Sequence, residues 1–245
     1  MSPAQKHRAY HLARKAALLA GDGAMNSAAA PEYELMKARL AVDLRRLHDI
    51  QSIERKIELK RELIVEYFPW LRGTLEGDGG GEDVIVTHMM IWAIDIGNFD
   101  MGLDLAEYVL RHKLTLPERF DRTAATLIVE EIADAAIKRL GRGEDFGMGV
   151  LDRVEALTDG ADIFDQVRAK LHKAIGLQLA FTAEGLSADA DGPAGARHAG
   201  LVLAVAQLRR ALELDATCGV KRRADDIDRA IRKLAEASAG TEATS

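Results

Sequence analysis

The spacing of apolar residues along this chain indicates helices almost everywhere. Apolar residues recur every three or four positions, which is the period of one face of an α-helix, and only Val84–Thr87 is β-branched over four residues. Proline stands where helices start, as in Ser2-Pro3 and Ala30-Pro31, because its missing N–H costs nothing in a first helical turn. The sequence therefore predicts an all-α fold.

One long charged helix is predicted from Glu32 to Phe68. Apolar residues recur about every 3.5 positions along it, so this stripe needs a partner, either in the same chain or in a neighbouring subunit. The length of the helix favours a seam between subunits, because such a helix can extend beyond a small domain. The residues assigned to oligomerisation are Leu40, Leu44, Leu47, Ile50, Ile53, Ile57 and Ile64.

A glycine-rich stretch divides the predicted helices into two parts. Residues 73–82 contain five glycines and are expected to form a linker. Residues 1–72 before it form an N-terminal helical arm, which carries the stripe assigned to oligomerisation. Residues 83–237 form a body of successive helices, and residues 238–245 form a flexible tail.

Two segments of the body are similar to parts of helical-hairpin repeats. Residues 97–117 match the second half of a tetratricopeptide-like unit, and Leu208–Asp215 match its end. Small and large apolar residues alternate there so that one hairpin can pack on the next. We expect a small layer of such hairpins, without a long array.

Cysteine content and hydropathy indicate an intracellular protein. Cys218 is the only cysteine, which excludes a disulfide framework and fits a reducing cytoplasm. The longest apolar stretch, Val84–Ile94, is interrupted by His88 and is too short to cross a membrane. The apolar segment Ala16–Ala20 is too short for a signal peptide. No membrane partner is expected.

The formal net charge of −6 conceals an asymmetry. Residues 1–61 hold twelve Lys and Arg against seven Asp and Glu, a balance of +5, whereas the remainder has a balance of −11. A basic end on an acidic body is typical of an arm that binds a polyanion, although it can also be the solvated face of a helix.

The basic segment is poor in aromatic residues. No Phe, Tyr or Trp occurs between Leu35 and Arg61, so this segment lacks the rings on which single-stranded bases stack. Phosphates of duplex DNA are therefore the expected partner. The residues predicted to contact them are Lys6, Arg8, Arg14, Lys15, Arg45, Arg46, Arg55, Lys56, Lys60 and Arg61.

No pattern in the sequence predicts a catalytic residue, a metal site or a cofactor. Residues 77–81 lack the Lys-Ser/Thr and the preceding strand of a phosphate-binding loop, and His7 and His11 have no third metal ligand nearby. Two acidic clusters lack the lysine and strand context of nuclease cores, and we interpret them as solvated helix faces. They are Glu130 and Glu131 with Asp134, and Asp225 and Asp226 with Asp228.

Short segments follow one another along the chain in a recognisable order. They are Ser2–His7, the charged helix ending in Pro69-Trp70, Met90–Trp92 leading into Asp95–Gly97, Ala106–Tyr108, Glu130-Glu131, Val167–Lys173, and Ala211–Asp215 before Val220-Lys221. Their order resembles that of the GpM-type small terminase subunits of tailed phages. The resemblance spans nearly the whole chain, and it is carried by the order of the segments rather than by one motif.

The resemblance implies a non-catalytic component of a DNA-packaging terminase. Such subunits form homo-oligomers, for which a ring is expected. In the host cytoplasm they recognise the packaging (cohesive-end) site of phage DNA. They present it to a large subunit that supplies the ATPase and endonuclease for cutting the DNA and packaging it into the prohead.

One departure from the family pattern lies at the end of the chain. Residues 237–245 lack the Lys-rich tail of some members, so DNA binding is expected to fall on the N-terminal arm. Two alternatives stay open: a helical-repeat scaffold for protein interactions that does not bind DNA, and a metal-dependent endonuclease component.

Overall fold

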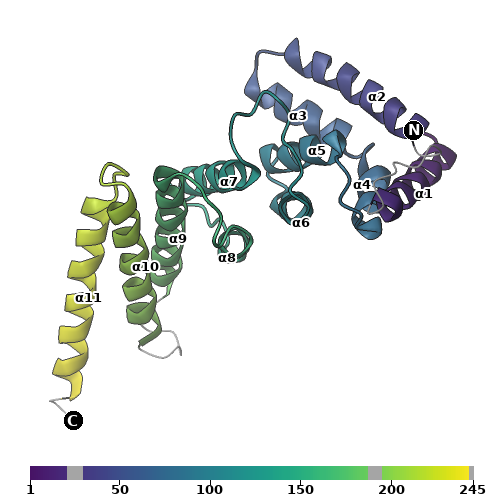
Figure 1. The fold of residues 1–245 in the computed structure, drawn as a ribbon. Helices are drawn as coiled ribbons and strands as arrows, with labels where there is room; N and C mark the ends of the chain where they lie inside the picture. Colours follow the sequence, from purple (N-terminus) through teal and green to yellow (C-terminus); the bar gives the residue numbers. More distant parts are fainter. Residues whose placement is uncertain (21–29, 187–194, 243–245) are drawn as a thin grey trace. The chain divides into compact units, whose positions relative to one another are not determined.

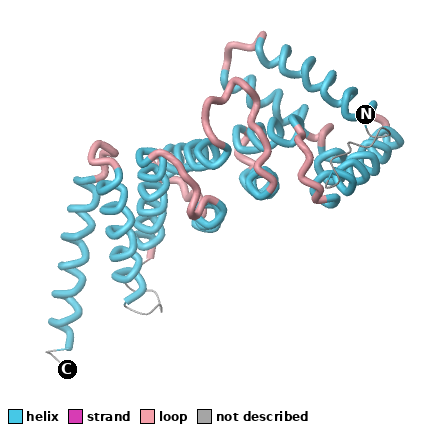
Figure 2. Tube along the Cα trace, viewed as in Figure 1, coloured by secondary structure: helices cyan, strands magenta, loops and turns pink. Residues whose placement is uncertain are grey.

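A computed structural model describes residues 1–20, 30–186 and 195–242 of the chain. Eleven α-helices and no strand occur within these residues, so the prediction of an all-α fold is confirmed (Figure 2). None of the described helices combines the length and hydropathy that a membrane span requires. Contacts divide the chain into two compact units, Met1–Ala124 and Ala125–Ser245.

The first unit is built around one helix that is buried along almost its whole length. It contains α1 (Pro3–Ala20), α2 (Ala30–His48), α3 (Ile53–Ile64), α4 (Phe68–Gly77), α5 (Val84–Asp95) and α6 (Phe99–Arg111) (Figure 1). Residues 85–94 of α5 are all buried, which is the pattern of a helix covered on every side. Helices α2, α3 and α6 pack against α5, and α1 packs against α4.

The prediction of one continuous helix from Glu32 to Phe68 is wrong, because the chain leaves the helix at residues 49–52. Ser52 takes an extended conformation and caps α3, its Oγ accepting a hydrogen bond from the backbone N–H of Arg55 at 3.4 Å. A serine that bonds to the backbone in this way competes with helix continuation. The break lets α2 and α3 each pack on α5 as separate helices.

The predicted glycine linker is partly helical and closely packed. Gly73 and Gly77 lie in α4 and face the small residues of α1, which repeat every fourth position as Ala9, Ala13 and Ala17. A Cβ added at Gly73 would lie 2.3 Å from the carbonyl oxygen of Tyr10, and one at Gly77 would lie 2.5 Å from the Ala17 Cβ. The glycines therefore allow the backbones of α1 and α4 to meet, and the contacts divide the chain at Ala124 and Ala125 rather than within residues 73–82.

The rest of the glycine-rich segment is held by hydrogen bonds. The N–H of Gly80 donates to the Tyr108 hydroxyl at 3.0 Å, and the Thr115 hydroxyl donates to Glu82 at 2.9 Å. At the end of α4, Asp78 Oδ1 lies 2.7 Å from His112 Nε2. These contacts bring the segment against α6 and the residues that follow it.

The described residues of the second unit form five helices. They are α7 (Ala124–Leu140), α8 (Met148–Leu157), α9 (Asp165–Gly185), α10 (Gly195–Leu214) and α11 (Lys221–Glu242). Helix α10 packs between α9 and α11, around a core that includes Leu201, Leu208 and Ile227 (Figure 1). The close approach of α9 to α10 uses Gly176, where a Cβ would lie 2.8 Å from the Leu208 side chain. The tetratricopeptide-like description of residues 97–117 and of Leu208–Asp215 stays a prediction.

Candidate nucleic-acid interface

Four of the predicted DNA-binding cations lie on α1 and are called the α1 patch: Lys6, Arg8, Arg14 and Lys15. Lys6 Nζ lies 3.7 Å from Glu66 Oε1, and Arg8 Nε lies 3.4 Å from Glu32 Oε2. Arg14 and Lys15 are exposed, and neither forms an ion pair with a carboxylate in the described part of the chain. The C-terminal half of α1 therefore presents two adjacent positive charges to solvent.

The other six cations lie near the junction of α2 and α3 and are called the corner patch: Arg45, Arg46, Arg55, Lys56, Lys60 and Arg61. Four of them contact other protein groups. Arg46 binds Asp43 at 3.2 Å, Lys60 binds Asp95, and Arg61 donates to the carbonyl oxygen of Ile96 at 3.2 Å. The Arg45 Nε donates to the carbonyl oxygen of Ala41 on its own helix. Arg55 and Lys56 have no ion pair among the described residues.

The α1 patch and the corner patch are separate surfaces. Arg8 contacts Glu32 at the start of α2, whereas Arg45 lies thirteen residues further along the same helix. At 1.5 Å per residue this separation is about 20 Å. The structure therefore places the ten predicted cations in two groups, and it does not bring them together as a single stripe.

The apolar stripe predicted to form a subunit seam lies mostly inside the first unit. Leu40, Leu47 and Ile64 are buried by the chain itself. Leu44, Ile50 and Ile57 are half-buried. Ile53, at the first position of α3, has 74% of its surface exposed. Most of the stripe thus contributes to the core of the unit, and Ile53 is the member that stays open to a partner.

The histidines and carboxylates noted in the sequence do not gather into a metal centre. His7 and His11 do lie together, with ring centroids 4.3 Å apart. The described residues contain no group of three His, Cys, Asp or Glu side chains that could hold a metal ion. In the second unit, Lys170 Nζ binds both Glu130 and Asp134, at 3.0 and 2.8 Å, so these two carboxylates share one cation.

The second acidic cluster also forms ion pairs. Asp228 lies 2.5 Å from Arg209 of α10, and Asp226 pairs with Arg229 one turn along α11. These contacts fit the interpretation of the cluster as a charged helix surface.

Two pockets of the first unit were not foreseen from the sequence. One, of about 420 Å³, is lined by Leu44, Leu47, His48, Lys56, Lys60, His88, Trp92 and Arg119. Burial lowers the pKa of His88, and the charge of the nearby Arg119 lowers it further. Only the tertiary fold brings His88 and Arg119 to Lys56, so no spacing in the sequence could indicate this pocket.

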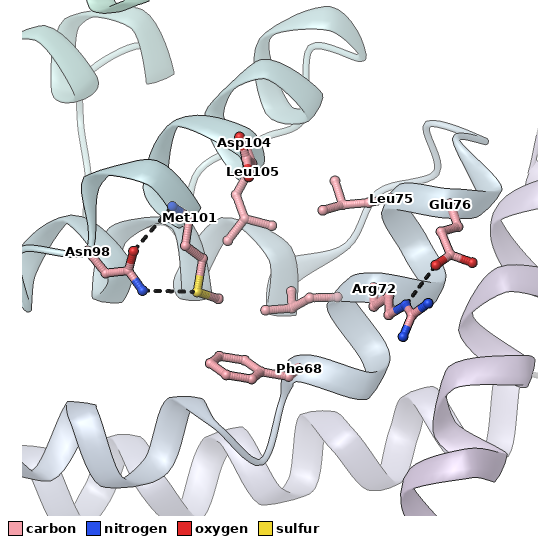
Figure 3. Close-up of a pocket in the computed structure, with 9 residues that line it drawn as sticks. Phe68, Arg72, Leu75, Glu76, Asn98, Met101, Asp104 and Leu105 are labelled. Atoms are coloured by element: carbon pink, nitrogen blue, oxygen red, sulfur yellow. Dashed lines mark hydrogen bonds and ion pairs between the residues drawn. The ribbon is translucent and has the colours of Figure 1, made fainter. Parts of the chain in front are cut away.

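The second pocket, of about 520 Å³, is an apolar groove between α4 and α6 (Figure 3). Phe68, with 42% of its surface exposed, forms one wall, and Met101 and Leu105 form the other. At the rim, Arg72 Nε binds Glu76 at 2.7 Å.

Comparisons with known proteins match this chain over most of its length. A family model described as phage small terminase subunit matches residues 37–166, more than half of the chain. The "Terminase, endonuclease subunit" of Escherichia phage P2 is 37% identical over 235 residues, which cover 96% of this chain and 87% of the phage P2 protein.

A more distant relative is the "Probable terminase, endonuclease subunit" of Haemophilus phage HP1, 21% identical over 204 residues, which cover 83% of this chain and 70% of that protein. No solved structure matches. The family match and the high coverage of the phage P2 protein together show that this chain belongs to the phage small terminase subunit family.

Proposed function

We propose that this small terminase subunit binds duplex DNA as a homo-oligomer and presents the packaging site to the terminase large subunit. The observation that carries the proposal is α1, which holds four cations and no Asp or Glu. Its Arg14 and Lys15 are exposed and have no ion pair among the described residues. Cations of this kind bind phosphates and release the counterions condensed on DNA.

The ion pairs of Lys6 and Arg8 differ in how far they leave the cation available. The Lys6 and Arg8 side chains are 42% and 70% exposed, whereas their partners Glu66 and Glu32 are 23% and 10% exposed. Glu66 also pairs with Arg39 and with the N-terminal amine, so Lys6 can bind a phosphate without leaving that carboxylate unpaired. Lys6, Arg14 and Lys15 are then available to one duplex, whereas Arg8 neutralises the largely buried Glu32.

Oligomerisation would make a modest patch effective. Two or three phosphate contacts per subunit give weak binding, whereas several subunits on one duplex raise the affinity through their effective concentration. The exposed Ile53 offers an apolar contact for such an assembly. A closed ring would direct all of its α1 patches to the same DNA.

The DNA-binding part is tested by the double variant Arg14→Glu/Lys15→Glu, titrated with one duplex over a series of salt concentrations. Each lost phosphate contact is expected to reduce the slope of log K against log [salt] by about 0.9. The matched control is Lys221→Glu/Arg222→Glu on α11, an adjacent exposed pair with the same change in charge. An unchanged slope for the α1 variant would refute the assignment, and an equal loss in both variants would indicate an effect of net charge alone.

The corner patch needs its own variant, because it lies about 20 Å from the α1 patch along α2. Arg45→Glu/Arg55→Glu changes two exposed residues of that patch. If both patches contact the same duplex, the two double variants reduce the salt slope additively. If only α1 binds DNA, the corner variant leaves the slope unchanged.

The oligomer is tested by light scattering coupled to size exclusion. A mass that is a whole multiple of 26.7 kDa at micromolar concentration is expected. A monomer over the whole range would contradict the homo-oligomer while leaving the salt-slope result intact.

A second candidate function follows from the names of the two phage relatives, which both contain "endonuclease subunit". It is tested by incubating the purified chain alone with supercoiled plasmid and Mg²⁺ or Mn²⁺. Nicking by the wild type that is lost in Glu130→Gln/Asp134→Asn would assign the activity to that carboxylate pair. No nicking would dismiss an intrinsic endonuclease.

A further inference from the structure

The pocket next to the corner patch has walls from four parts of the first unit. The end of α2 provides Leu44, Leu47 and His48, and α3 provides Lys56 and Lys60. Helix α5 adds His88 and Trp92, and Arg119 comes from the segment after α6. Its volume of about 420 Å³ lies in the range of small-ligand sites.

The charge of this lining is of one sign. Five of the eight lining residues are Lys, Arg or His, and none is Asp or Glu. Lys60 is paired with Asp95, whereas Lys56 and Arg119 have no ion pair with a described carboxylate. A recess lined by one sign of charge concentrates the electrostatic field and attracts counter-ions. The lining therefore favours an anion.

Trp92 adds a directional donor at this pocket. Its side chain is completely buried, and its indole Nε1 has no hydrogen-bond partner among the described residues. By contrast, the Nε1 of Trp70 donates to Asp83 at 2.7 Å. Buried N–H groups nearly always have an acceptor, so this indole N–H is a donor that a ligand oxygen or an ordered water would satisfy.

His88 is oriented by the backbone. Its Nδ1 lies 2.8 Å from the carbonyl oxygen of Val84, an acceptor, so Nδ1 carries the proton. Nε2 is then the ring nitrogen left for a ligand. A hydroxyl of a partly protonated oxyanion can donate to Nε2 of a neutral ring.

We propose that this pocket binds a phosphate monoester, held by Lys56 and Arg119 and hydrogen-bonded by Trp92 Nε1. Arginine and lysine are the side chains that recognise phosphate, and the planar guanidinium can bind two of its oxygens. A recess admits a terminal phosphate, whether it ends a nucleic-acid chain or belongs to a small molecule. A phosphodiester within a duplex is flanked by nucleotides on both sides, which keep it from entering the recess. Two sources share this chemistry: the phosphate at a DNA end and a free mononucleotide.

This inference goes beyond the proposed DNA binding by α1 and does not depend on it. The pocket shares Lys56 and Lys60 with the corner patch, whereas His48, His88, Trp92 and Arg119 belong to neither patch. All eight lining residues lie within the segment that matches the family model.

The direct test follows the two indole N–H signals of the ¹⁵N-labelled full chain by NMR. Titration with a deoxynucleoside 5′-monophosphate at constant ionic strength is expected to shift the Trp92 signal and leave the Trp70 signal in place. Trp70→Phe assigns the two signals. The unphosphorylated nucleoside is the control ligand. No shift of the Trp92 signal, or an equal shift with the unphosphorylated nucleoside, would overturn the proposal.

Variants then test the named residues. Arg119→Ala changes an exposed side chain outside the regular helices, and Lys56→Ala changes a half-buried one. Each is expected to weaken phosphate affinity about tenfold or more, the cost of losing a charged hydrogen bond. Lys138→Ala, an exposed residue of α7 that does not line the pocket, is the control. Affinity unchanged in both pocket variants would contradict the assignment.

Two duplexes of identical sequence, one with 5′-phosphate ends and one with 5′-hydroxyl ends, distinguish the sources. Tighter binding of the phosphorylated duplex, with the difference lost in Arg119→Ala, would identify a DNA end as the ligand. Equal binding of the two duplexes, with a Trp92 shift from the mononucleotide, would identify a free nucleotide. The Arg14→Glu/Lys15→Glu variant is expected to keep the Trp92 shift, so a failure of α1 to bind DNA and a failure of the pocket are separate results.

Discussion

The indole Nε1 of Trp70 donates a 2.7 Å hydrogen bond to Asp83 Oδ2, and the other oxygen of the same carboxylate caps α5. Asp83 Oδ1 accepts from the backbone N–H groups of Ile85 and Val86 at 2.9 and 3.3 Å. One buried side chain therefore joins α4 to the start of the central helix. Burial raises the pKa of Asp83, although the three hydrogen bonds favour its charged form and lower the pKa.

Asp83→Ala is expected to reduce the free energy of unfolding by about 1–3 kcal/mol, because it leaves the Trp70 N–H and the first turn of α5 without an acceptor. Asp83→Asn keeps a carbonyl oxygen for the cap but places its NH2 group against the Trp70 N–H, so it is expected to recover only part of the stability that the alanine variant loses. The free energy of unfolding of both variants is measured by urea denaturation, monitored by circular dichroism. Equal stability of the alanine variant and the wild type would show that this carboxylate does not hold α4 to α5.

Gly77→Ala is expected to destabilise the first unit by about 1–3 kcal/mol, the usual cost of overpacking, because α1 and α4 must separate to admit the methyl group. Gly149→Ala on α8 is the control, since a Cβ there meets nothing within 4 Å. That substitution is expected to stabilise its helix by up to about 1 kcal/mol. Denaturation of the two variants gives the comparison. A Gly77→Ala protein as stable as the wild type would contradict the close contact.

Alkaline pH is expected to weaken the first unit. Burial and the nearby charge of Asp83 together raise the pKa of Tyr33 to about 12, although the hydrogen bond from the Val84 N–H to the phenol oxygen acts in the opposite direction. Burial and a hydrogen bond to Asp43 likewise raise the pKa of Tyr67. A tyrosine in an unfolded chain ionises near pH 10.

The folded state therefore holds the phenol protons of Tyr33 and Tyr67 more tightly than the unfolded state does. The stability that these tyrosines contribute is complete below about pH 10 and is lost as the pH rises towards the pKa of the folded state. Tyr33→Phe is expected to make the unfolding free energy less dependent on pH between about 10 and 12. Denaturation at a series of pH values, with a near-ultraviolet absorbance titration, tests this. Ionisation of all four tyrosines together near pH 10 would refute it.

Two residues of the apolar stripe, Leu40 and Ile53, are expected to respond differently to truncation. Leu40→Ala should cost about 2–5 kcal/mol, because Leu40 is buried in the first unit. Ile53→Ala should leave unfolding nearly unchanged and weaken self-association, because this side chain is exposed. Denaturation and light scattering on both variants separate the two roles. Unchanged association of Ile53→Ala would place the subunit contact elsewhere.

Helical periodicity was enough to predict the fold class, because burial of one face is a local property of the sequence. The same periodicity continues through residues 49–52, because Ile50 keeps the spacing of the stripe. The periodicity alone therefore could not reveal that the helix is interrupted there. The decisive signal there is a single serine, Ser52, whose side chain caps a new helix. The apolar stripe favours one continuous helix, whereas the serine cap favours a new helix. The packing of α2 and α3 on α5 decides between the two.

The candidate site was predictable in composition but not in layout. The charge asymmetry identified the segment that carries the ten predicted cations, and these lie on helices as expected. Their division into two patches depends on how α2 runs across the first unit, which the sequence does not indicate. Gly73 and Gly77 were interpreted as part of a linker, because the spacing of glycines does not indicate which helix they pack against. The partner is the alanine repeat of α1, some sixty residues away.

The contact between α1 and α4 bears on the DNA binding proposed above. Because the α1 backbone lies directly against Gly73 and Gly77, the helix that carries Arg14 and Lys15 is held in place in the absence of any ligand. Ordering a free segment on binding would cost conformational entropy, whereas a helix fixed in advance gives up only side-chain freedom. Two glycines without any charge of their own thus preorganise the cationic surface, which would lower the entropic cost of the proposed association with DNA.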